Sequence, residues 1–351
     1  MLKSLDVRNF KSIKHLKFDF DGLNVLVGTN SSGKSSVLQS ILLCSQNIRP
    51  KAGLNGDLIS LGEYKDVKCA YSNEKEIEVN LIFDNGNQVS VTSSSDWFKS
   101  NYMGEHVSEC LDYSTMNFQY LSCQRIGPQK IYDKNVSLVD NLGLDGRYAI
   151  SFLQKHKSDA IPEKLCKNSY SYTLLSQVNW WLKYITETEI YTQDVVGADK
   201  VQAFYSSGDL NNLRPDNVGA GISYLVSILI ECLAAPENGI IIIENPEIHL
   251  HPSAQSKVCE FLYYISKAGR QLFIETHSDH IFNGFRAGIA NGEMDKSSIG
   301  INFLFIDEEH LTKNIVVDIG RMGRIENQHK DMFDQFDIDL NKMLGIRRPK
   351  E

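Results

Sequence analysis

A glycine-rich segment near the N-terminus constrains the fold of this chain more than any other feature. Residues 28–35 read Gly-Thr-Asn-Ser-Ser-Gly-Lys-Ser, which matches G-x-x-x-x-G-K-[ST] at every fixed position. The pattern predicts an apolar strand at 23–27 directly before this segment and an amphipathic helix at 34–47 directly after it. Glycines let successive backbone N–H groups surround phosphate oxygens, and a helix N-terminus favours negative charge. The segment therefore predicts a phosphate-binding loop, in which Lys34 contacts the β- and γ-phosphates and Ser35 ligates Mg²⁺.

A second motif supplies the acid that such a loop needs. Residues 240–243 are four consecutive isoleucines, typical of a strand buried on both faces of a parallel sheet, and Glu244 follows them. A carboxylate at the end of a neighbouring strand can hold the metal ion and act on water. The alternative is a core strand that happens to end in glutamate.

Two weaker signals accompany these motifs. Gly219-Ala220-Gly221-Ile222-Ser223 precedes an apolar helix predicted at 222–233, and a glycine pair at a helix start can be an anion site or a plain turn. His277 follows a buried strand predicted at 271–275. A neutral imidazole there could contact a γ-phosphate or an attacking water, although a lone histidine is often structural.

Composition excludes several classes of protein. The 351 residues are 42% hydrophobic, with 36 Lys+Arg against 44 Asp+Glu, a net charge of −8. These values exclude a disordered chain and a strongly basic DNA-coating protein, but not a local basic groove. The seven cysteines form no CxxC pair, which favours reduced thiols in a cytoplasmic protein without a zinc ribbon. No apolar run reaches the roughly 18 residues of a membrane span, so no membrane association is expected.

The pattern of elements predicts an α/β chain in four parts. Alternating residues indicate strands over 2–27 and an antiparallel meander over 64–92, with a hairpin turn at 84–87. Helices are predicted at 147–157, 171–186 and 253–268, and strands at 301–306 and 314–319. The predicted parts are an N-terminal half with the phosphate-binding loop and a β lobe (1–92), an insertion (93–210), a C-terminal half with the glycine pair, Glu244 and His277 (211–326), and a helical tail with a basic end (327–351).

The order of these motifs resembles the ABC-type ATPase heads of the SMC/RecF/OLD-like group. The segment VRNFKSIKHLKFDFDGLNVLVGTNSSGKSS is similar to that group, while IIIENPEIHLHPSAQ and IETHSDHI resemble its OLD-like branch. DMFDQFDIDLNKML resembles a tail of small ATPases of this type, several of which occur in bacterial anti-phage operons. The resemblance covers residues 1–65 and 215–350, and is loose around 120–128. It implies a P-loop NTPase fold, with a mixed sheet, an N-terminal antiparallel β lobe and a partly helical insertion.

The resemblance also implies roles for particular residues, with ATP and Mg²⁺ as cofactors. The implied ATP-binding residues are Gly28, Asn30, Ser31, Ser32, Gly33, Lys34, Ser35 and Ser36, joined from the partner head by Gly219, Gly221 and Ser223. The implied metal-site residues are Ser35, Glu244 and Gln124, the last as a lobe-coupling glutamine. The implied catalytic residues are Glu244, Asn245, Glu247 and the switch histidine His277. Residues 247–251 would lie at the dimer interface, and Arg125 would either contact phosphate or shape its loop.

Two departures from the family pattern matter for activity. Such heads usually end this strand in Asp-Glu, whereas here Asn245 stands in the second position. An amide cannot accept a proton at neutral pH, so we expect slow hydrolysis and a long-lived ATP-bound dimer. The glycine signature also lacks the usual serine before Gly219.

Three functional hypotheses follow. The first is an ATP-driven switch that dimerises, or forms a higher oligomer, and controls a separately encoded effector, a nuclease or toxin of an anti-phage operon. The second is a RecF-type clamp on DNA ends, with a DNA face formed by Lys3, Arg8, Lys11, Lys14 and Lys17. The third is a metal hydrolase that uses His249, His251, His277 and His280. The P-loop explains more of the chain than the third hypothesis does.

Overall fold

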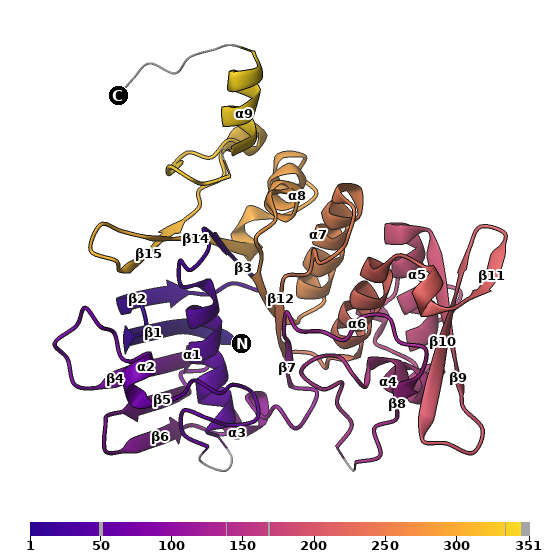
Figure 1. Cartoon of the computed structure of the whole chain (residues 1–351), viewed down its shortest axis with the longest axis horizontal. Coiled ribbons are helices and arrows are strands. Elements are labelled where there is room, and N and C mark those ends of the chain that lie inside the picture. The colour runs from indigo at the N-terminus through magenta and orange to yellow at the C-terminus, as the bar shows by residue number, and fades with distance from the viewer. Residues whose placement is uncertain (49–51, 138, 168, 334, 345–351) are drawn as a thin grey trace.

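A mixed six-stranded sheet forms the centre of the molecule (Figure 1). The computed structural model describes residues 1–48, 52–137, 139–167, 169–333 and 335–344. The strand order is β15 (Thr312–Val316), β14 (Ile299–Ile306), β3 (Leu23–Gly28), β13 (Gln271–Glu275), β12 (Ile240–Glu244) and β7 (Phe118–Leu121). All neighbours are parallel except β14 and β15. The carboxyl ends of β3, β13 and β12 therefore meet at one edge, and the expected α/β fold with a mixed sheet is confirmed.

An antiparallel sheet forms the N-terminal lobe. Its order is β2 (Ile13–Asp19), β1 (Leu2–Phe10), β4 (Ile77–Phe83), β5 (Gln88–Ser93) and β6 (Phe98–Met103). The predicted hairpin turn at 84–87 is present, since Ile82 pairs with Gln88. The start of the predicted meander is instead a short helix, α2 (Tyr64–Val67). Glu63 and Asp66 form a capping box there, and these reciprocal bonds favour a helical turn over a strand.

The predicted insertion at 93–210 divides among three places. β6 extends the N-terminal sheet and β7 joins the central sheet, while the short helix α3 (Val107–Cys110) lies between them. The remainder forms a lateral lobe with helices α4 (Ala149–His156) and α5 (Leu174–Thr186), close to the predicted helices. The lobe also contains a sheet that was not predicted: β8 (Tyr132–Asp133), β9 (Thr188–Asp194), β10 (Lys200–Ser207) and β11 (Leu210–Leu213).

The central sheet separates two hydrophobic cores. Ile240 and Ile242 face the core that contains α1 (Lys34–Gln46) and the N-terminal sheet. Ile241 and Ile243 face the other core, under α6 (Ala220–Ala234), α7 (Pro252–Lys267) and α8 (Asp279–Ala290). Side chains alternate across a strand, so a run of four isoleucines serves both cores.

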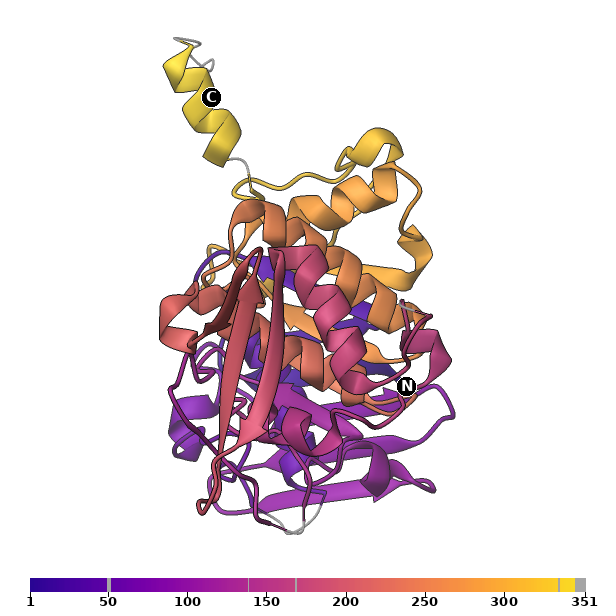
Figure 2. The ribbon, with the colours of Figure 1, turned by 90° about the vertical axis from the view of Figure 1, so that its right-hand side faces the viewer.

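The tail projects away from this body as α9 (Gln335–Met343) (Figure 2). The basic end predicted after this helix falls on residues 345–351, which lie outside the described part of the chain. None of the helices in the described ranges combines the length and apolar character that a bilayer crossing requires.

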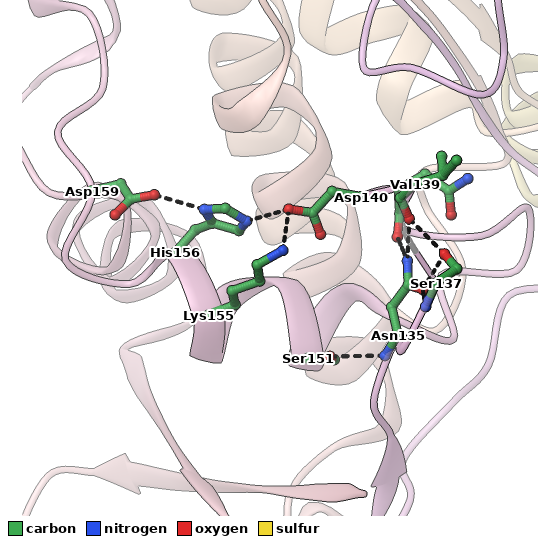
Figure 3. Close-up of polar contacts among 9 residues, drawn as sticks. Asn135, Ser137, Val139, Asp140, Ser151, Lys155, His156 and Asp159 are labelled. Carbon is green, nitrogen blue, oxygen red and sulfur yellow. Dashed lines mark hydrogen bonds and ion pairs between the residues drawn. The ribbon is translucent and has the colours of Figure 1, made fainter.

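The segment between β8 and α4 is fixed by ionic contacts (Figure 3). Lys155 Nζ and His156 Nε2 lie 2.8 and 2.6 Å from the same carboxylate oxygen of Asp140. His156 Nδ1 lies 2.6 Å from Asp159. The contacts of Asp140 tie this segment to α4. Residues 143–145, 147 and 148, at the end of the same segment, line a cavity together with Glu244.

Candidate nucleotide-binding site

The predicted phosphate-binding loop connects β3 to α1, and its fixed glycines have steric reasons. Gly28 has φ 147° and Gly33 has φ 101°. A Cβ at Gly28 would collide with the carbonyl oxygen of Leu304, and one at Gly33 with the hydroxyl of Thr312. Only glycine satisfies both the backbone angle and the close approach of the neighbouring strands.

Lys34 turns back over the loop. Its Nζ donates to the carbonyl oxygens of Gly28 and Thr29 at 3.0 and 2.8 Å. Burial lowers the pKa of Lys34, while the charges of Glu275 and Glu247 oppose this shift. The ammonium group thus lies over the loop, where phosphate oxygens would be more favourable partners than carbonyls.

The loop lines a cavity of about 670 Å³. Seven of the eight predicted triphosphate-binding residues line it; Gly28 instead contributes its carbonyl to Lys34. The buried Ser32 hydroxyl has no hydrogen-bond partner within the described part of the chain, as expected of a group that faces a ligand. Further lining residues are Lys11, Ser12, Asp66, Glu275 and His277.

Glu275 is a site residue that the sequence analysis missed. It ends β13 and lies in register beside Glu244, the last residue of β12. The Ser35 hydroxyl donates to Glu275 Oε1 at 2.9 Å, and Glu275 Oε2 is buried without a partner among the described residues. Burial and the nearby charge of Glu244 raise the pKa of Glu275 to about 7. The available signal was its position: it ends a buried strand in the same way as Glu244.

Glu244 is held by β7 and by the segment that follows this strand. Tyr120 Oη donates to Glu244 Oε1 at 3.1 Å, and the backbone N–H of Cys123 donates to Oε2 at 2.9 Å. A second cavity of about 670 Å³ opens here, and Ser35, Glu244 and Gln124 all line it. The structure therefore brings the three predicted metal-site residues to one cavity. Burial and the charge of Glu244 raise the pKa of Tyr120, so its hydroxyl remains a donor.

Of the remaining predicted catalytic residues, Asn245 and Glu247 lie in the turn after β12, and His277 follows β13. Asn245 has φ 46°, an angle that asparagine tolerates better than most residues, and its side-chain oxygen is buried without a partner in the described structure. Glu247 Oε1 accepts the backbone N–H of His277 at 3.0 Å. Burial, followed by the charge of Lys34, lowers the pKa of His277, which favours a neutral imidazole at the loop cavity.

The glycine signature lies at the N-terminus of α6. Gly219 and Gly221 line a separate cavity of about 330 Å³, together with His249 and His251. A Cβ at Gly221 would collide with the carbonyl oxygen of His249, so this glycine permits the close contact.

Ser223, the third residue of the predicted signature, is buried. It is 5% exposed, and its hydroxyl lies 3.5 Å from the Tyr205 hydroxyl in the interior. Two residues along a helix rotate a side chain by about 200°, so Ser223 points away from the side where Gly221 lies. The structure therefore does not bring Ser223 together with the two glycines, and its role at the phosphate of a partner stays a prediction.

The DNA-clamp and metal-hydrolase hypotheses find less support in the geometry than the ATP-driven switch does. Asp6 pairs with Arg8 at 3.3 Å and with Lys17 at 3.2 Å, so the predicted basic face is partly neutralised. His249 packs against the Tyr224 ring, and His251 accepts the N–H of Ser253 as a helix cap. Throughout the described ranges, no group of three or more His, Cys, Asp or Glu side chains is placed to hold a metal ion.

Comparison with known proteins identifies the family. A family model described as "AAA ATPase domain" matches residues 1–164 and 154–282. The chain is similar to the DNA replication and repair protein RecF of Thermoanaerobacter sp. (strain X514), at 34% identity over 104 residues, which are 26% of this chain and 29% of RecF. It is also similar to the DNA double-strand break repair Rad50 ATPase of Archaeoglobus fulgidus, at 38% identity over 60 residues, 17% of this chain and 7% of Rad50. The match thus spans less than a third of each relative.

Solved structures show the same fold. The Smc head domain with an extended coiled coil from Pyrococcus furiosus, bound to the C-terminal domain of ScpA, superposes with a TM-score of 0.60 at 11% identity and covers 99% of both chains. The SMC head domain from Thermotoga maritima gives 0.52 at 12% identity, over 91% of this chain and 99% of that one. The chain therefore belongs to the AAA ATPase domain family and has the fold of an ABC-type, SMC- and RecF-like ATPase head.

Proposed function

We propose that this chain binds ATP with Mg²⁺ and hydrolyses it slowly, and that two copies join around the nucleotide to form a switch. The observation that carries this proposal is the contact between Ser35, the last residue of the loop motif, and Glu275. Ser35 donates to Glu275, and Glu275 lies in register with Glu244. A hydroxyl and two carboxylates next to a phosphate-binding lysine are the donor set for a metal–triphosphate complex.

The residues present fit Mg²⁺. Ser35, Glu244 and Glu275 offer oxygen ligands, and one buried oxygen of Glu275 lacks a partner in the described chain. Gln124 lines the same cavity and could add its amide oxygen. When bound, the ion would neutralise charge on the β- and γ-phosphate oxygens.

Slow turnover is supported by the turn after β12. The Asn245 amide cannot accept a proton, which leaves Glu247 as the candidate base beside His277. We expect turnover below about 10 s⁻¹, the median for enzymes.

Dimerisation is supported by the separation of the two glycine motifs. The cavity of the signature glycines and the cavity of the phosphate-binding loop share no lining residue. The signature and the loop thus lie in different cavities of one copy, and we propose that the signature of a second copy approaches the loop.

We further propose that the dimer controls a separate effector, a nuclease or toxin of an anti-phage operon. The support is the resemblance of IIIENPEIHLHPSAQ and of the C-terminal tail to small OLD-like ATPases. The seven free cysteines suit a reducing compartment such as the cytoplasm.

A DNA clamp is the second candidate, and the similarity to RecF favours it. Binding of duplex DNA that weakens steeply with salt would support this candidate, because phosphate contacts release counterions.

The first experiment compares wild type with Lys34→Ala. It measures ATP binding, turnover with Mg²⁺ and mass by light scattering. Nucleotide binding, slow turnover and a larger mass with ATP, all lost in the variant, would support the switch. Absence of ATP binding by the wild type would refute it.

A further inference from the structure

Arg125 is a buried arginine that contacts the end of β12 from the interior. It is 4% exposed. Its two terminal nitrogens donate to the carbonyl oxygens of Glu244 at 2.5 Å and Asn245 at 2.6 Å, and one of them also reaches the Ser122 carbonyl at 3.3 Å. A planar guanidinium fork can bridge consecutive carbonyls in this way, whereas a single ammonium cannot match both directions.

The same short segment also holds the side chain of Glu244. Tyr120 and the N–H of Cys123 each donate to one oxygen of its carboxylate. Residues 120–125 therefore fix both the side chain and the peptide carbonyl of Glu244. The next peptide is fixed as well, because the N–H of Asn245 donates to the Glu275 carbonyl at 2.7 Å.

Arg125 also lies close to the helix that begins with the signature. Glu231 of α6 is 1% exposed, and its carboxyl oxygens have no partner within the described ranges. The Nε of Arg125 is likewise buried and unpartnered there. Burial raises the pKa of Glu231, and the charge of Arg125 opposes this rise.

We propose that Arg125 is a positioning residue for the nucleotide site. Its two carbonyl contacts set the direction in which the chain leaves β12. That direction keeps Glu244 facing Ser35 and keeps Glu247 on the backbone of His277. The inference rests on the proposed ATP-binding function and adds a residue that acts through Glu244 and Asn245 without touching the nucleotide.

The chain provides a matched control in Arg270. This arginine is 1% exposed, and its guanidinium donates to the carbonyls of Ala235 at 2.9 and 3.1 Å and of Ala268 at 2.5 Å. It lies next to the start of β13, at the opposite edge of the central sheet from the site. Arg125→Lys and Arg270→Lys therefore remove the same chemistry from equally buried places.

The experiment measures four quantities for both variants: the melting temperature, kcat for ATP hydrolysis, KM for ATP, and the Mg²⁺ concentration at which ATP binding is half-maximal. Both variants should melt at lower temperatures. Only Arg125→Lys should lower kcat, by about 10- to 100-fold, and raise the Mg²⁺ concentration for half-maximal ATP binding, by about 10-fold or more. Losses of this size are typical when a residue that orients a metal ligand is replaced. KM for ATP measured at saturating Mg²⁺ should change by less than about 3-fold.

Equal behaviour of the two variants in kcat and in Mg²⁺ dependence would overturn the inference while leaving the ATPase intact. Failure of the wild type to bind ATP would instead refute the underlying function, and the inference with it. If Arg125→Lys does not fold, Arg125→Gln, which retains one amide donor, is measured against Arg270→Gln with the same criteria.

Discussion

Glu247 is the carboxylate best placed to replace the acid that Asn245 cannot supply. One of its oxygens accepts the His277 N–H, and the other is buried without a partner in the described structure. We predict that Glu247→Gln lowers kcat by about 100-fold or more, because general-base catalysis contributes factors of that size. ATP affinity should stay near the wild-type value and the ATP-bound dimer should last longer, as measured by steady-state turnover and light scattering. Unchanged turnover in this variant would place the base elsewhere.

Glu231 should make the stability of the protein depend on pH. Burial raises the pKa of Glu231 to about 8, with the charge of Arg125 opposing. In the unfolded chain this group ionises near its ordinary value of 4.5. Between these pH values the folded state binds one more proton than the unfolded state. The free energy of unfolding therefore falls as pH rises, by about 1.4 kcal/mol per pH unit, and this loss levels off above about pH 8.

We therefore predict that Glu231→Gln removes this contribution. Urea denaturation between about pH 5 and 8 should show a shallower loss of stability than in wild type. Parallel pH profiles for the two proteins would mean that Glu231 is not protonated in the fold.

Among single residues, the sequence could predict those whose position in a motif fixes their chemistry. Lys34 and Ser35 follow from the loop pattern, and the structure places both at the cavity that the loop lines. Glu275 was missed because its position in the site depends on pairing with β12, which is a contact between distant segments. The direction of Ser223 could not be predicted, because it depends on how helix α6 packs beside Tyr205.

Helix α6 approaches the segment after β12 most tightly at Gly221 among its glycines. A Cβ at Gly221 would collide with the His249 carbonyl, whereas a Cβ at Gly219 would meet no atom within 4 Å. We predict that Gly221→Ala shifts the start of α6, retains ATP binding and loses ATP-dependent dimerisation. Gly219→Ala should keep the wild-type melting temperature, which serves as the steric control. Normal dimerisation of Gly221→Ala, measured by light scattering with ATP, would contradict the packing argument.

Strands β9 and β10 and helix α8 escaped prediction for identifiable reasons. Only half of the inward positions of β9 and β10 carry large apolar side chains, because Thr188, Thr192 and Ala203 fill the others, so the alternation is weak in the sequence. α8 contains two glycines, which argue against a helix in the sequence. Gly284 is explained by packing, because a Cβ there would press on the Sγ of Cys259 in α7.

For the whole molecule, the order of strands in the central sheet assembles the site. The chain visits β3, β7, β12 and β13 in sequence, yet β13 lies between β3 and β12. This order puts the phosphate-binding loop beside Glu275, and Glu275 beside Glu244. Hydrophobic patterns identified each of these strands except β7, but pairing between distant strands leaves no local pattern. The position of Glu275 beside Glu244 therefore became visible only in the structure.

The proposed composite site between two copies makes a prediction that neither copy alone can satisfy. Lys34→Ala should not hold ATP, because the ammonium over the loop is lost. Gly221→Ala should hold ATP but fail to complete the site of its partner. In an equimolar mixture, the loop of the Gly221→Ala copy can meet the intact signature of the Lys34→Ala copy, which restores one of the two sites. We predict an ATP-dependent heterodimer and measurable hydrolysis in the mixture only, detected by light scattering and phosphate release. A mixture as inactive as its components would mean that each copy completes its own site, which the separate cavities of loop and signature argue against.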